Sequence, residues 1–405
     1  MIKIQVSRTL QGKIRQGYPW VFHYQVQNEI SGGKSGDLAV VYDSDNQFLA
    51  VGLFDPESDI RLRILQSGKS ASIDAAFFES RLQQALELRE PLASEETTGY
   101  RVINGENDGF PGLILDRYAD TAVLKLYTSA WKPYLKTLLP LFERHLPIDR
   151  CVLRWSRKVL DSAGASGEWE DGRVLFGPPV TGSPVTGSIR FREQGLCFEA
   201  DVLSGQKTGF FLDQRDNRQH IRSLSAGKSV LNVFSYTGAF SVYAFAGGCR
   251  SVLEIDANPI ALAVSERNLR LNFSERVFAP EEFEQIHGDA FETLAGLAAR
   301  KQKFEIVLLD PPAFAKRKKQ SQSALDAYAR LVEAGTRLTA NRGVLFAASC
   351  SVHVDSTEFY EAVFSGIRAA GRSYEEIRRT GHALDHPVTF RQGDYLKAIY
   401  CRIGG

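Results

Sequence analysis

The chain has 405 residues, which is more than one ordinary domain holds, so we expect two or three domains. Apolar residues make up 43% and charged residues 24%, as in soluble globular proteins, and the net charge of +1 excludes a uniformly basic nucleic-acid-binding protein. Five scattered cysteines without a C-x-x-C pair argue against disulfides and against a metal site. Because no apolar run approaches membrane-spanning length and the first residues are unlike a signal peptide, we expect a cytoplasmic protein with no membrane partner.

Residues 1–68 are predicted to form a compact all-β domain. Strands are expected over 38–42 and 48–54, joined by a run of turn-forming residues. The next strand alternates apolar and basic side chains, so Arg61 and Arg63 are expected to share its exposed face as a candidate basic patch.

Residues 71–188 are predicted to form a second, α+β domain. Helices are expected over 71–90, where apolar residues recur at helical spacing, and over 131–145. The domain ends in the Pro-, Gly- and Ser-rich stretch 177–188, which is the best linker candidate in the chain. Its short strands are expected over 112–118, 121–126 and 151–154.

Residues 190–405 are predicted to form an α/β domain with a Rossmann-like fold. Near-continuous apolar strands alternate with helices, which indicates a parallel sheet covered on both faces. Ligands of such sheets bind at the carboxyl ends of the strands, and the candidate site residues follow strands. Strands are expected over 229–234, 251–256, 304–309 and 343–348, and helices over 239–246 and 259–271.

The first turn of this domain, residues 234–240, predicts the kind of cofactor. It carries one glycine, whereas dinucleotide-binding turns use three to bring the backbone against a pyrophosphate. A cofactor without phosphates therefore fits better, and S-adenosylmethionine is the expected one. The alternative is a plain strand-to-helix turn. The candidate cofactor-binding residues of the turn are Phe234, Ser235, Tyr236, Thr237 and Gly238.

Acidic residues follow the next two strands. Asp256 ends the second strand, where a carboxylate can accept hydrogen bonds from both ribose hydroxyls, and Glu254 is a second candidate for that role. For both acids the alternative is a helix cap or a surface charge, although Asn258 is the better cap because a proline follows it. Asp289 and Ala290 follow the third strand, where Asp289 is expected to accept a hydrogen bond from an adenine amino group.

The segment 205–215 precedes the sheet and is a further cofactor candidate. Two glycines, two aromatic residues and several polar side chains predict a loop that folds over a ligand, and its candidate residues are Phe210, Asp213 and Arg215. The alternative is a turn that leads into a helix starting near Asp213.

Two residues at strand ends are candidates for catalysis. Asp310 opens the run Asp-Pro-Pro-Ala-Phe, and Cys350 follows the strand expected over 343–348. A free thiol beside the cofactor predicts covalent attack on a pyrimidine ring, which requires that the surroundings stabilise the thiolate. The alternative is a small buried residue, which we expect for the remaining cysteines, Cys151, Cys197, Cys249 and Cys401.

These motifs together resemble those of the RlmI-type class I methyltransferases, bacterial enzymes that make 5-methylcytosine in large-subunit ribosomal RNA. The run Gly-Tyr-Pro-Trp-Val-Phe at 17–22 is similar to the opening of that family's PUA domain, a small β-barrel that binds RNA. The resemblance covers essentially the whole chain and implies a PUA domain, a central α+β domain and a C-terminal Rossmann-like catalytic domain. The other matching motifs are Gln-Lys-Thr-Gly-Phe-Phe-Leu-Asp-Gln-Arg at 206–215, Phe-Ser-Tyr-Thr-Gly at 234–238, Asp-Pro-Pro-Ala-Phe at 310–314, Ser-Cys-Ser at 349–351 and Asp-His-Pro-Val at 385–388.

The resemblance implies that Cys350 attacks C6 of a cytosine in 23S ribosomal RNA, naked or in an assembling subunit. Asp310 is expected to hydrogen-bond the base edge or to accept a proton, and Phe314 to stack on the base next to the rigid Pro312. Many RNA cytosine-C5 enzymes carry a second cysteine after this aspartate. Ala313 stands there, which fits the family but leaves open which group removes the C5 proton. Members are often dimers, so a homodimer is one expected state.

A basic run follows the Asp-Pro-Pro segment. Lys316, Arg317 and Lys318 are expected to hold phosphates that flank the target nucleotide, and the alternative is an exposed solubilising run. A lesser candidate patch surrounds Trp155 and consists of Arg154, Arg157 and Lys158.

Two other functions compete with cytosine methylation. Related domains methylate guanine nitrogens by direct transfer without a nucleophile and tend to carry asparagine where this chain has Cys350. An RNA-binding assembly factor with a degenerate methyltransferase domain would lack Asp256, Asp310 or the glycine turn, all of which are present. DNA is a chemically feasible substrate, but a PUA-like N-terminus favours RNA.

Overall fold

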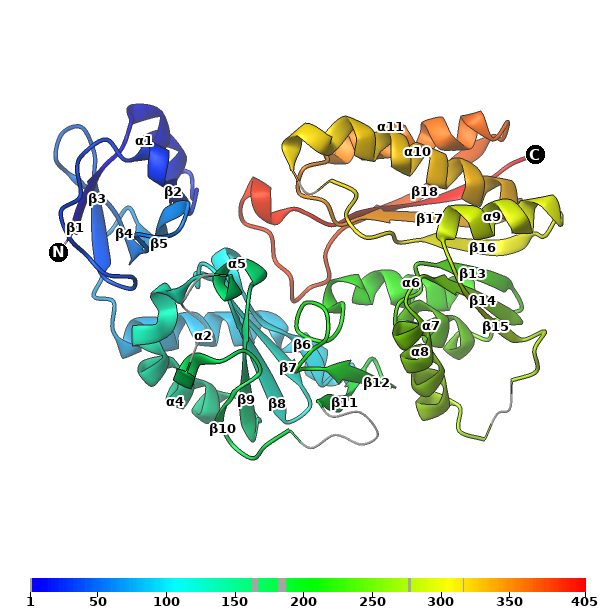
Figure 1. Ribbon diagram of the computed structural model, residues 1–405, viewed down its shortest axis with the longest axis horizontal. Coiled ribbons are helices and arrows are strands. Elements are labelled where there is room, and N and C mark those ends of the chain that lie inside the picture. Colours follow the sequence, from blue (N-terminus) through cyan, green and yellow to red (C-terminus); the bar gives the residue numbers. More distant parts are fainter. Residues whose placement is uncertain (1, 162–166, 181–186, 276–277, 316) are drawn as a thin grey trace. The chain divides into compact units, whose positions relative to one another are not determined.

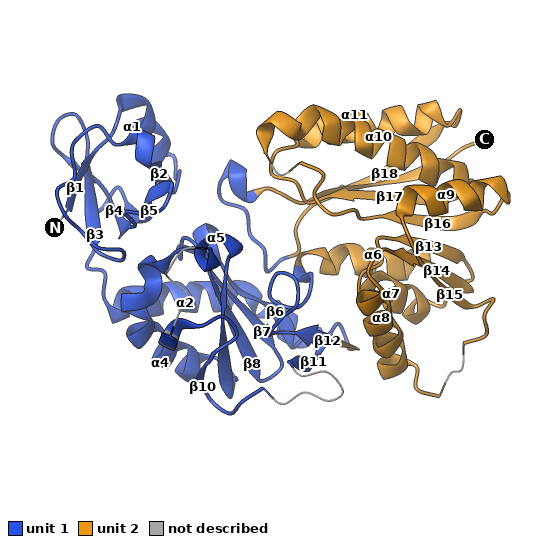
Figure 2. Ribbon diagram, viewed as in Figure 1, with its two compact units in different colours: residues 1–195, 199–212, 384–393 blue, residues 196–198, 213–383, 394–405 orange. Residues whose placement is uncertain are grey.

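The computed structural model describes residues 2–161, 167–180, 187–275, 278–315 and 317–405. The chain divides into two compact units (Figure 2). Unit 1 comprises Met1–Gly195, Glu199–Leu212 and Leu384–Gly393, and unit 2 comprises Leu196–Phe198, Asp213–Ala383 and Asp394–Gly405. Three segments of the predicted C-terminal domain, residues 190–195, 199–212 and 384–393, thus cluster with unit 1. The domain boundaries taken from the sequence stay predictions, and residues 181–186 of the proposed linker lie outside the described residues.

The first sheet of unit 1 is formed by residues 2–67 (Figure 1). Its order is β1-β3-β4-β5-β2, with β1 parallel to β3 and the other pairs antiparallel. Its core includes Ile4, Val41 and Leu62, together with side chains of α1. The elements are β1 (Ile2–Gln5), α1 (Arg8–Arg15), β2 (Trp20–Phe22), β3 (Leu38–Tyr42), β4 (Phe48–Phe54) and β5 (Ile60–Ser67).

The second sheet of unit 1 has the order β10-β9-β8-β7-β6, and α2 and α4 pack with it around buried aromatic rings. Phe78, Phe110 and Trp131 lie at the centre of this core, with ring centroids 5.7–6.1 Å apart. The elements are α2 (Ala75–Arg89), α3 (Pro91–Ser94), β6 (Gly99–Asn104), β7 (Leu113–Tyr118), β8 (Thr121–Leu126), α4 (Leu135–His145), β9 (Arg150–Trp155), α5 (Arg157–Leu160) and β10 (Val174–Phe176), followed by the ribbon β11 (Ser188–Glu193) and β12 (Leu196–Asp201).

Two arginines that were candidates for basic patches are buried, so the exposed face expected for Arg63 and the inclusion of Arg154 in a patch are both wrong. Arg63 is 4% exposed and Arg154 is 8% exposed. Strand β5 has a core on both faces, because Leu62 belongs to the core of the first sheet and Leu65 to that of the second. Burial lowers the pKa of the Arg63 guanidinium. Arg154 pairs with Asp171 at 3.3 Å, so neither arginine offers a surface to nucleic acid.

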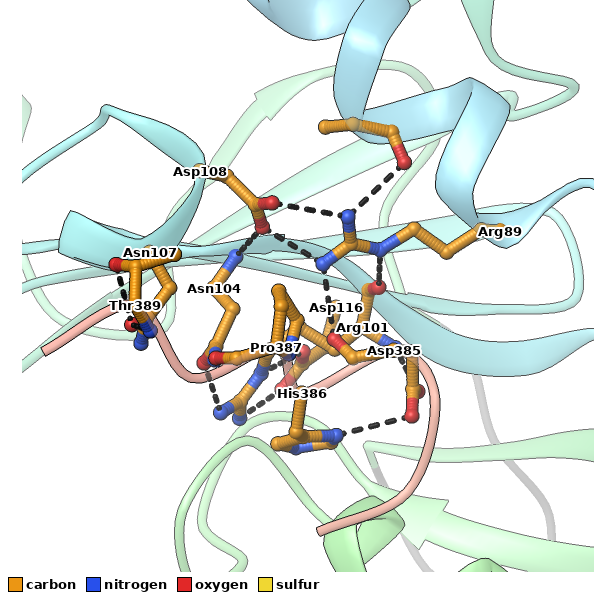
Figure 3. Close-up of polar contacts among 11 residues, drawn as sticks. Arg89, Arg101, Asn104, Asn107, Asp108, Asp116, Asp385, His386, Pro387 and Thr389 are labelled. Atoms are coloured by element: carbon orange, nitrogen blue, oxygen red, sulfur yellow. Dashed lines mark hydrogen bonds and ion pairs between the residues drawn. The ribbon is translucent and has the colours of Figure 1, made fainter. Parts of the chain in front are cut away.

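The segment Leu384–Gly393 is anchored in unit 1 through a buried polar cluster (Figure 3). The Asp385 carboxylate accepts a hydrogen bond from the backbone N–H of Arg101 at 2.8 Å, and its backbone carbonyl accepts one from Arg89 at 2.9 Å. Asp385 and the adjacent His386, whose Nδ1 lies 3.0 Å from the Asp385 carboxylate, are both at most 2% exposed. This motif, quoted above for its family resemblance, therefore has a structural role in unit 1.

Unit 2 contains a seven-stranded sheet of order β15-β14-β13-β16-β17-β19-β18, in which β19 is antiparallel to both of its neighbours. Helices α6, α7 and α8 cover one face and α9, α10 and α11 the other (Figure 1). The Rossmann-like prediction is confirmed. The elements are α6 (Arg215–Leu224), β13 (Ser229–Val233), α7 (Ala239–Ala246), β14 (Ser251–Asp256), α8 (Pro259–Asn272), β15 (Phe283–His287), α9 (Ala290–Ala299), β16 (Phe304–Leu309), α10 (Ser321–Leu338), β17 (Thr339–Ser349), α11 (Ser356–Ala369), β18 (Tyr374–Thr380) and β19 (Lys397–Ile403).

The described residues lack both membrane-spanning helices and metal-binding clusters. None of their helices is both long enough and apolar enough to cross a membrane. Three or more His, Cys, Asp and Glu side chains do not gather anywhere among them in a group that could hold a metal ion.

Candidate active site

Strand pairing brings the predicted site residues of unit 2 to one edge of the sheet. Val233 lies opposite both Ile255 and Leu309, and Leu309 lies opposite Ala347. Because these strands are parallel, the residues that follow them lie along their common carboxyl edge. The order of the sheet reverses between β13 and β16, which is where such folds bind ligands. The residues at this edge are the turn 234–238, Asp256, Asp289, Asp310 and Cys350.

The turn 234–238 has a backbone suited to holding a ligand. Phe234, Tyr236 and Gly238 have φ values of +62°, +49° and +72°, and a left-handed backbone is uncommon and costly for residues other than glycine. Ser235 is 6% exposed, and its hydroxyl has no hydrogen-bond partner among the described residues. A buried hydroxyl normally has a partner, so the turn fits a bound polar group. Thr237 is also buried, and its carbonyl accepts from Asn268 at 2.8 Å.

Asp256 is positioned by the backbone around it. One carboxylate oxygen accepts from the backbone N–H of Tyr236 and the other from that of Asn258, each at 2.8 Å. Asn258 in turn caps α8, with Pro259 at its first position, so the predicted cap is confirmed. Asp256 therefore lies half-buried against the turn, where a carboxylate can still accept a hydroxyl of a bound ribose.

The other acidic candidates have partners within the fold. Glu254 is fully buried, and its carboxylate accepts from Ser265 and Gln285 at 2.8 Å. Burial raises the pKa of Glu254. Asp289 caps α9 by accepting from the N–H of Glu292 at 3.1 Å, with the buried Ala290 as first helical residue. Cofactor binding by Glu254, Asp289 and Ala290 stays a prediction.

The segment 205–215 is divided between the two units. In unit 1, the Thr208 hydroxyl donates to the Asp116 carboxylate at 2.5 Å, and Phe210 is buried against Phe191 with centroids 5.0 Å apart. In unit 2, Asp213 is buried and accepts from the Tyr395 hydroxyl at 2.8 Å. Arg215, which opens α6, is fully buried. That Phe210, Asp213 and Arg215 bind the cofactor stays a prediction.

Asp310 and Cys350 follow adjacent strands, and two residues not singled out from the sequence support them. Gln214 donates to the Asp310 carboxylate at 3.0 Å. The Tyr328 hydroxyl lies 2.9 Å from that of Ser349, the residue before Cys350. Burial raises the pKa of Tyr328 to about 12, with smaller contributions from the charges of Cys350 and Asp310. Gln214 lies in the motif at 206–215, so the sequence contained a signal for it. Tyr328 lies in α10 at a spacing typical of any core residue, so the sequence contained no signal for its role.

The predicted substrate contacts surround this pair. Pro312 is exposed, and the half-buried Phe314 packs against Tyr328 with ring centroids 4.8 Å apart. Arg317 and Lys318 are exposed in the segment that follows Phe314, where Arg317 precedes a short 3-10 helix that begins at Lys318. Lys316 lies outside the described residues. An exposed cationic loop of this kind can contact phosphates, and the half-buried ring can contact a base.

Unit 1 offers a row of partly exposed aromatic rings near β2. Phe22 and Tyr24 are stacked with centroids 5.5 Å apart, and Tyr24 is 70% exposed. Trp20 continues the row and meets Phe390, from the anchored segment 384–393, at 5.2 Å. Exposed rings in a row can stack on successive unpaired bases, which is a common way to bind single-stranded nucleic acid.

Comparisons with known proteins identify the family of the chain. A family model described as S-adenosylmethionine-dependent methyltransferase matches residues 179–361, and one described as a PUA-like domain matches residues 4–67. A ribosomal RNA large subunit methyltransferase of Deinococcus radiodurans is 43% identical over 99% of this chain and 97% of its own length. The ribosomal RNA large subunit methyltransferase I of Serratia proteamaculans is 32% identical over 99% of each chain.

Solved structures share the fold. A candidate methyltransferase crystallised with S-adenosylhomocysteine superposes with a TM-score of 0.83 over 99% of this chain and all of its own, at 22% identity. At that identity the likeness concerns the fold alone.

Proposed function

Because the chain belongs to the family of ribosomal RNA large subunit methyltransferases, with S-adenosylmethionine as cofactor and a PUA-like N-terminal domain, we propose that it methylates C5 of a cytosine in 23S ribosomal RNA. The observation that carries the proposal is the thiol of Cys350, which is not in a disulfide and directly follows β17, next to the strand that ends before Asp310. A methyltransferase that acts on a base nitrogen needs no nucleophile at this position.

The proposed reaction begins with the Cys350 thiolate. Its sulfur forms a bond to C6 of cytosine, and the electron pair of the C5–C6 double bond becomes available at C5. C5 takes the methyl group, and S-adenosylhomocysteine is the second product. A base then removes the C5 proton, the double bond forms again, and the S–C6 bond breaks to return the thiolate. Asp310 either holds the N3/N4 edge of the base or accepts that proton.

The residues of the turn fit the cofactor. S-adenosylmethionine supplies an electrophilic methyl group on a sulfonium, together with a ribose and an adenine that need polar partners. The Asp256 carboxylate would hold the ribose, and the buried hydroxyl of Ser235 would meet a further polar group. Glu254 would act on the cofactor indirectly, because its carboxylate lies close to Gly238 of the turn, 2.8 Å from where a Cβ would stand.

Replacing Gly238 by alanine is expected to weaken cofactor binding about tenfold or more, which corresponds to about 1.4 kcal/mol. An added Cβ would lie 1.8 Å from the Ser265 hydroxyl and 2.8 Å from the Glu254 carboxylate, at a φ of +72°. Calorimetric titration with S-adenosylhomocysteine measures the effect. Gly227→Ala is the matched control, since Gly227 has a φ of +69° but nothing within 4 Å of an added Cβ. Equal affinities in the two variants would contradict the assigned turn.

The substrate is expected to contact unit 1 as well as the catalytic edge. The aromatic row of Trp20, Phe22 and Tyr24 offers stacking surfaces, and Arg317 and Lys318 offer phosphate contacts. Unpaired target nucleotides would be favoured, because a paired cytosine must first leave its stack at a cost of a few kcal/mol. A homodimer stays a prediction.

The deciding experiment is methylation with radiolabelled S-adenosylmethionine. The substrate is 23S ribosomal RNA from a strain that lacks this gene, and the control is 16S RNA from the same strain. Nucleoside mass spectrometry is expected to find the label in 5-methylcytidine from 23S RNA. Label in a methylguanosine would keep the cofactor site and refute the cytosine-C5 assignment.

A further inference from the structure

Lys397 is a buried lysine whose ammonium lies at the loop that follows Cys350. It is the first residue of β19 and is paired with Ser349 across the antiparallel ladder. Lys397 is only 5% exposed. The ammonium donates to the backbone carbonyls of Ser351 and Val354, both at 2.6 Å. These two bonds fix the course of the chain directly after the thiol.

We propose that Lys397 is a positioning residue that stabilises the thiolate of Cys350 and holds the loop on which that thiolate depends. The proposal rests on the proposed function, in which Cys350 is the nucleophile. A thiolate is the reactive form of cysteine, and a nearby positive charge is a usual means of favouring it.

The charges around Lys397 support this role. Its ammonium has no carboxylate within ion-pair distance in the described part of the chain, although burying a charge is costly unless it is compensated. The acidic groups that act on it are Asp394, which is exposed and lies 3.7 Å from His382, and Asp355, which caps α11. Cys350 is the third.

The coupling between the lysine and the cysteine acts in both directions. Burial lowers the pKa of Lys397, and Asp394, Cys350 and Asp355 raise it. Electrostatic coupling is reciprocal. If the thiolate of Cys350 stabilises the charged form of Lys397, then the ammonium of Lys397 stabilises that thiolate by the same free energy. Tyr328 also interacts electrostatically with Cys350. It carries no charge that would compete with Lys397, since burial raises the pKa of Tyr328 to about 12.

The loop itself is tied to the second catalytic candidate. The Ser351 hydroxyl donates to the carbonyl of Ala315 at 3.0 Å, in the loop that begins with Asp310. Lys397 binds the carbonyl of the same serine. One cation therefore fixes the chain that leaves Cys350, and through Ser351 it supports the neighbouring loop of the site.

The test measures the thiol directly in the full-length protein. The rate at which iodoacetamide alkylates Cys350 is followed against pH by mass spectrometry of the peptide that contains it. In Lys397→Met the midpoint of this profile is expected to move upward by about one pH unit or more, the usual size of the effect of a nearby charge. Lys397→Arg keeps the charge and is expected to restore the wild-type midpoint. The matched control is Lys136→Met, which removes an exposed lysine in unit 1.

Methyl transfer at neutral pH is expected to fall about tenfold in Lys397→Met, with an unchanged KM for S-adenosylmethionine, because a shift of one pH unit leaves a tenth of the thiolate. Should the methionine variant fail to fold, Lys397→Gln removes the charge but keeps a donor for the carbonyls. An unchanged alkylation midpoint in a folded, uncharged variant would overturn the proposal. Failure of the proposed function has a different signature, namely turnover that survives loss of the Cys350 thiol.

Discussion

Replacing Cys350 by alanine is expected to abolish methyl transfer and to leave cofactor binding close to that of the unchanged protein. The turnover number is expected to fall by on the order of 10⁴-fold or more, the scale on which enzymes lose activity without their nucleophile. The loss should be confined to the chemical step, because Cys350 follows β17 whereas the turn 234–238 and Asp256 follow β13 and β14. Single-turnover kinetics and calorimetric titration with S-adenosylhomocysteine separate the two effects.

The matched control is Cys197→Ala. Cys197 is half-buried like Cys350 and lies in β12, where its backbone pairs with Asn272, so the same chemical change is made away from the site. The turnover number of Cys197→Ala is expected to stay within about twofold of that of the unchanged protein, because substitutions away from the site usually have small effects. RNA containing 5-fluorocytidine adds a second test. After methyl transfer its C5 carries fluorine in place of the proton that the base would remove, and fluorine cannot leave as a cation, so the S–C6 bond persists and the RNA stays attached. Turnover in Cys350→Ala would refute covalent catalysis.

The catalytic edge could be predicted because its pattern is local. Strands β13, β14 and β16 and the second half of β17 are short, largely apolar runs. The ligand candidates lie at or just after the ends of these runs, so pairing of the strands was enough to bring Asp256, Asp310 and Cys350 to one edge. The same logic predicted Asn258 as a cap, because its signal lies in the adjacent proline.

Long-range packing explains what the sequence did not reveal. Arg63 lies in a strand whose alternation predicts one exposed face, but the second sheet of unit 1 covers that face. The alternation of residues within 1–68 carries no information about this packing. Lys397 comes forty-seven residues after Cys350, in a part of the sequence for which neither a strand nor a site residue was predicted. The pairing of β19 with β17 reveals its place beside Ser349. The clustering of residues 384–393 with unit 1 likewise depends on contacts with residues almost three hundred positions earlier.

Removing the Asp108 carboxylate is expected to lower the free energy of unfolding of unit 1 by about 3–5 kcal/mol, the usual cost of leaving one partner of a buried ion pair alone. Asp108 accepts from the Arg89 guanidinium at 2.6 Å and from the backbone N–H of Asn104 at 2.6 Å (Figure 3). The side chains of Arg89 and Asp108 are 1% and 6% exposed. Arg89 also donates to the carbonyls of Arg101 and Asp385, so the loss should loosen the anchored segment 384–393.

Urea unfolding followed by tryptophan fluorescence measures this effect in unit 1. The four tryptophans, Trp20, Trp131, Trp155 and Trp169, all lie in that unit, so the signal is free of unit 2. Asp59→Ala is the matched control, because Asp59 and its partner Lys158 are both more than half exposed, and such surface pairs contribute about 0–1 kcal/mol. If the two variants unfold at the same urea concentration, the buried pair does not stabilise unit 1. If Asp108→Ala alone unfolds at a lower urea concentration, the resistance of residues 384–393 to proteolysis should fall as well. Arg89 binds both the Asp108 carboxylate and the Asp385 carbonyl in the anchored segment.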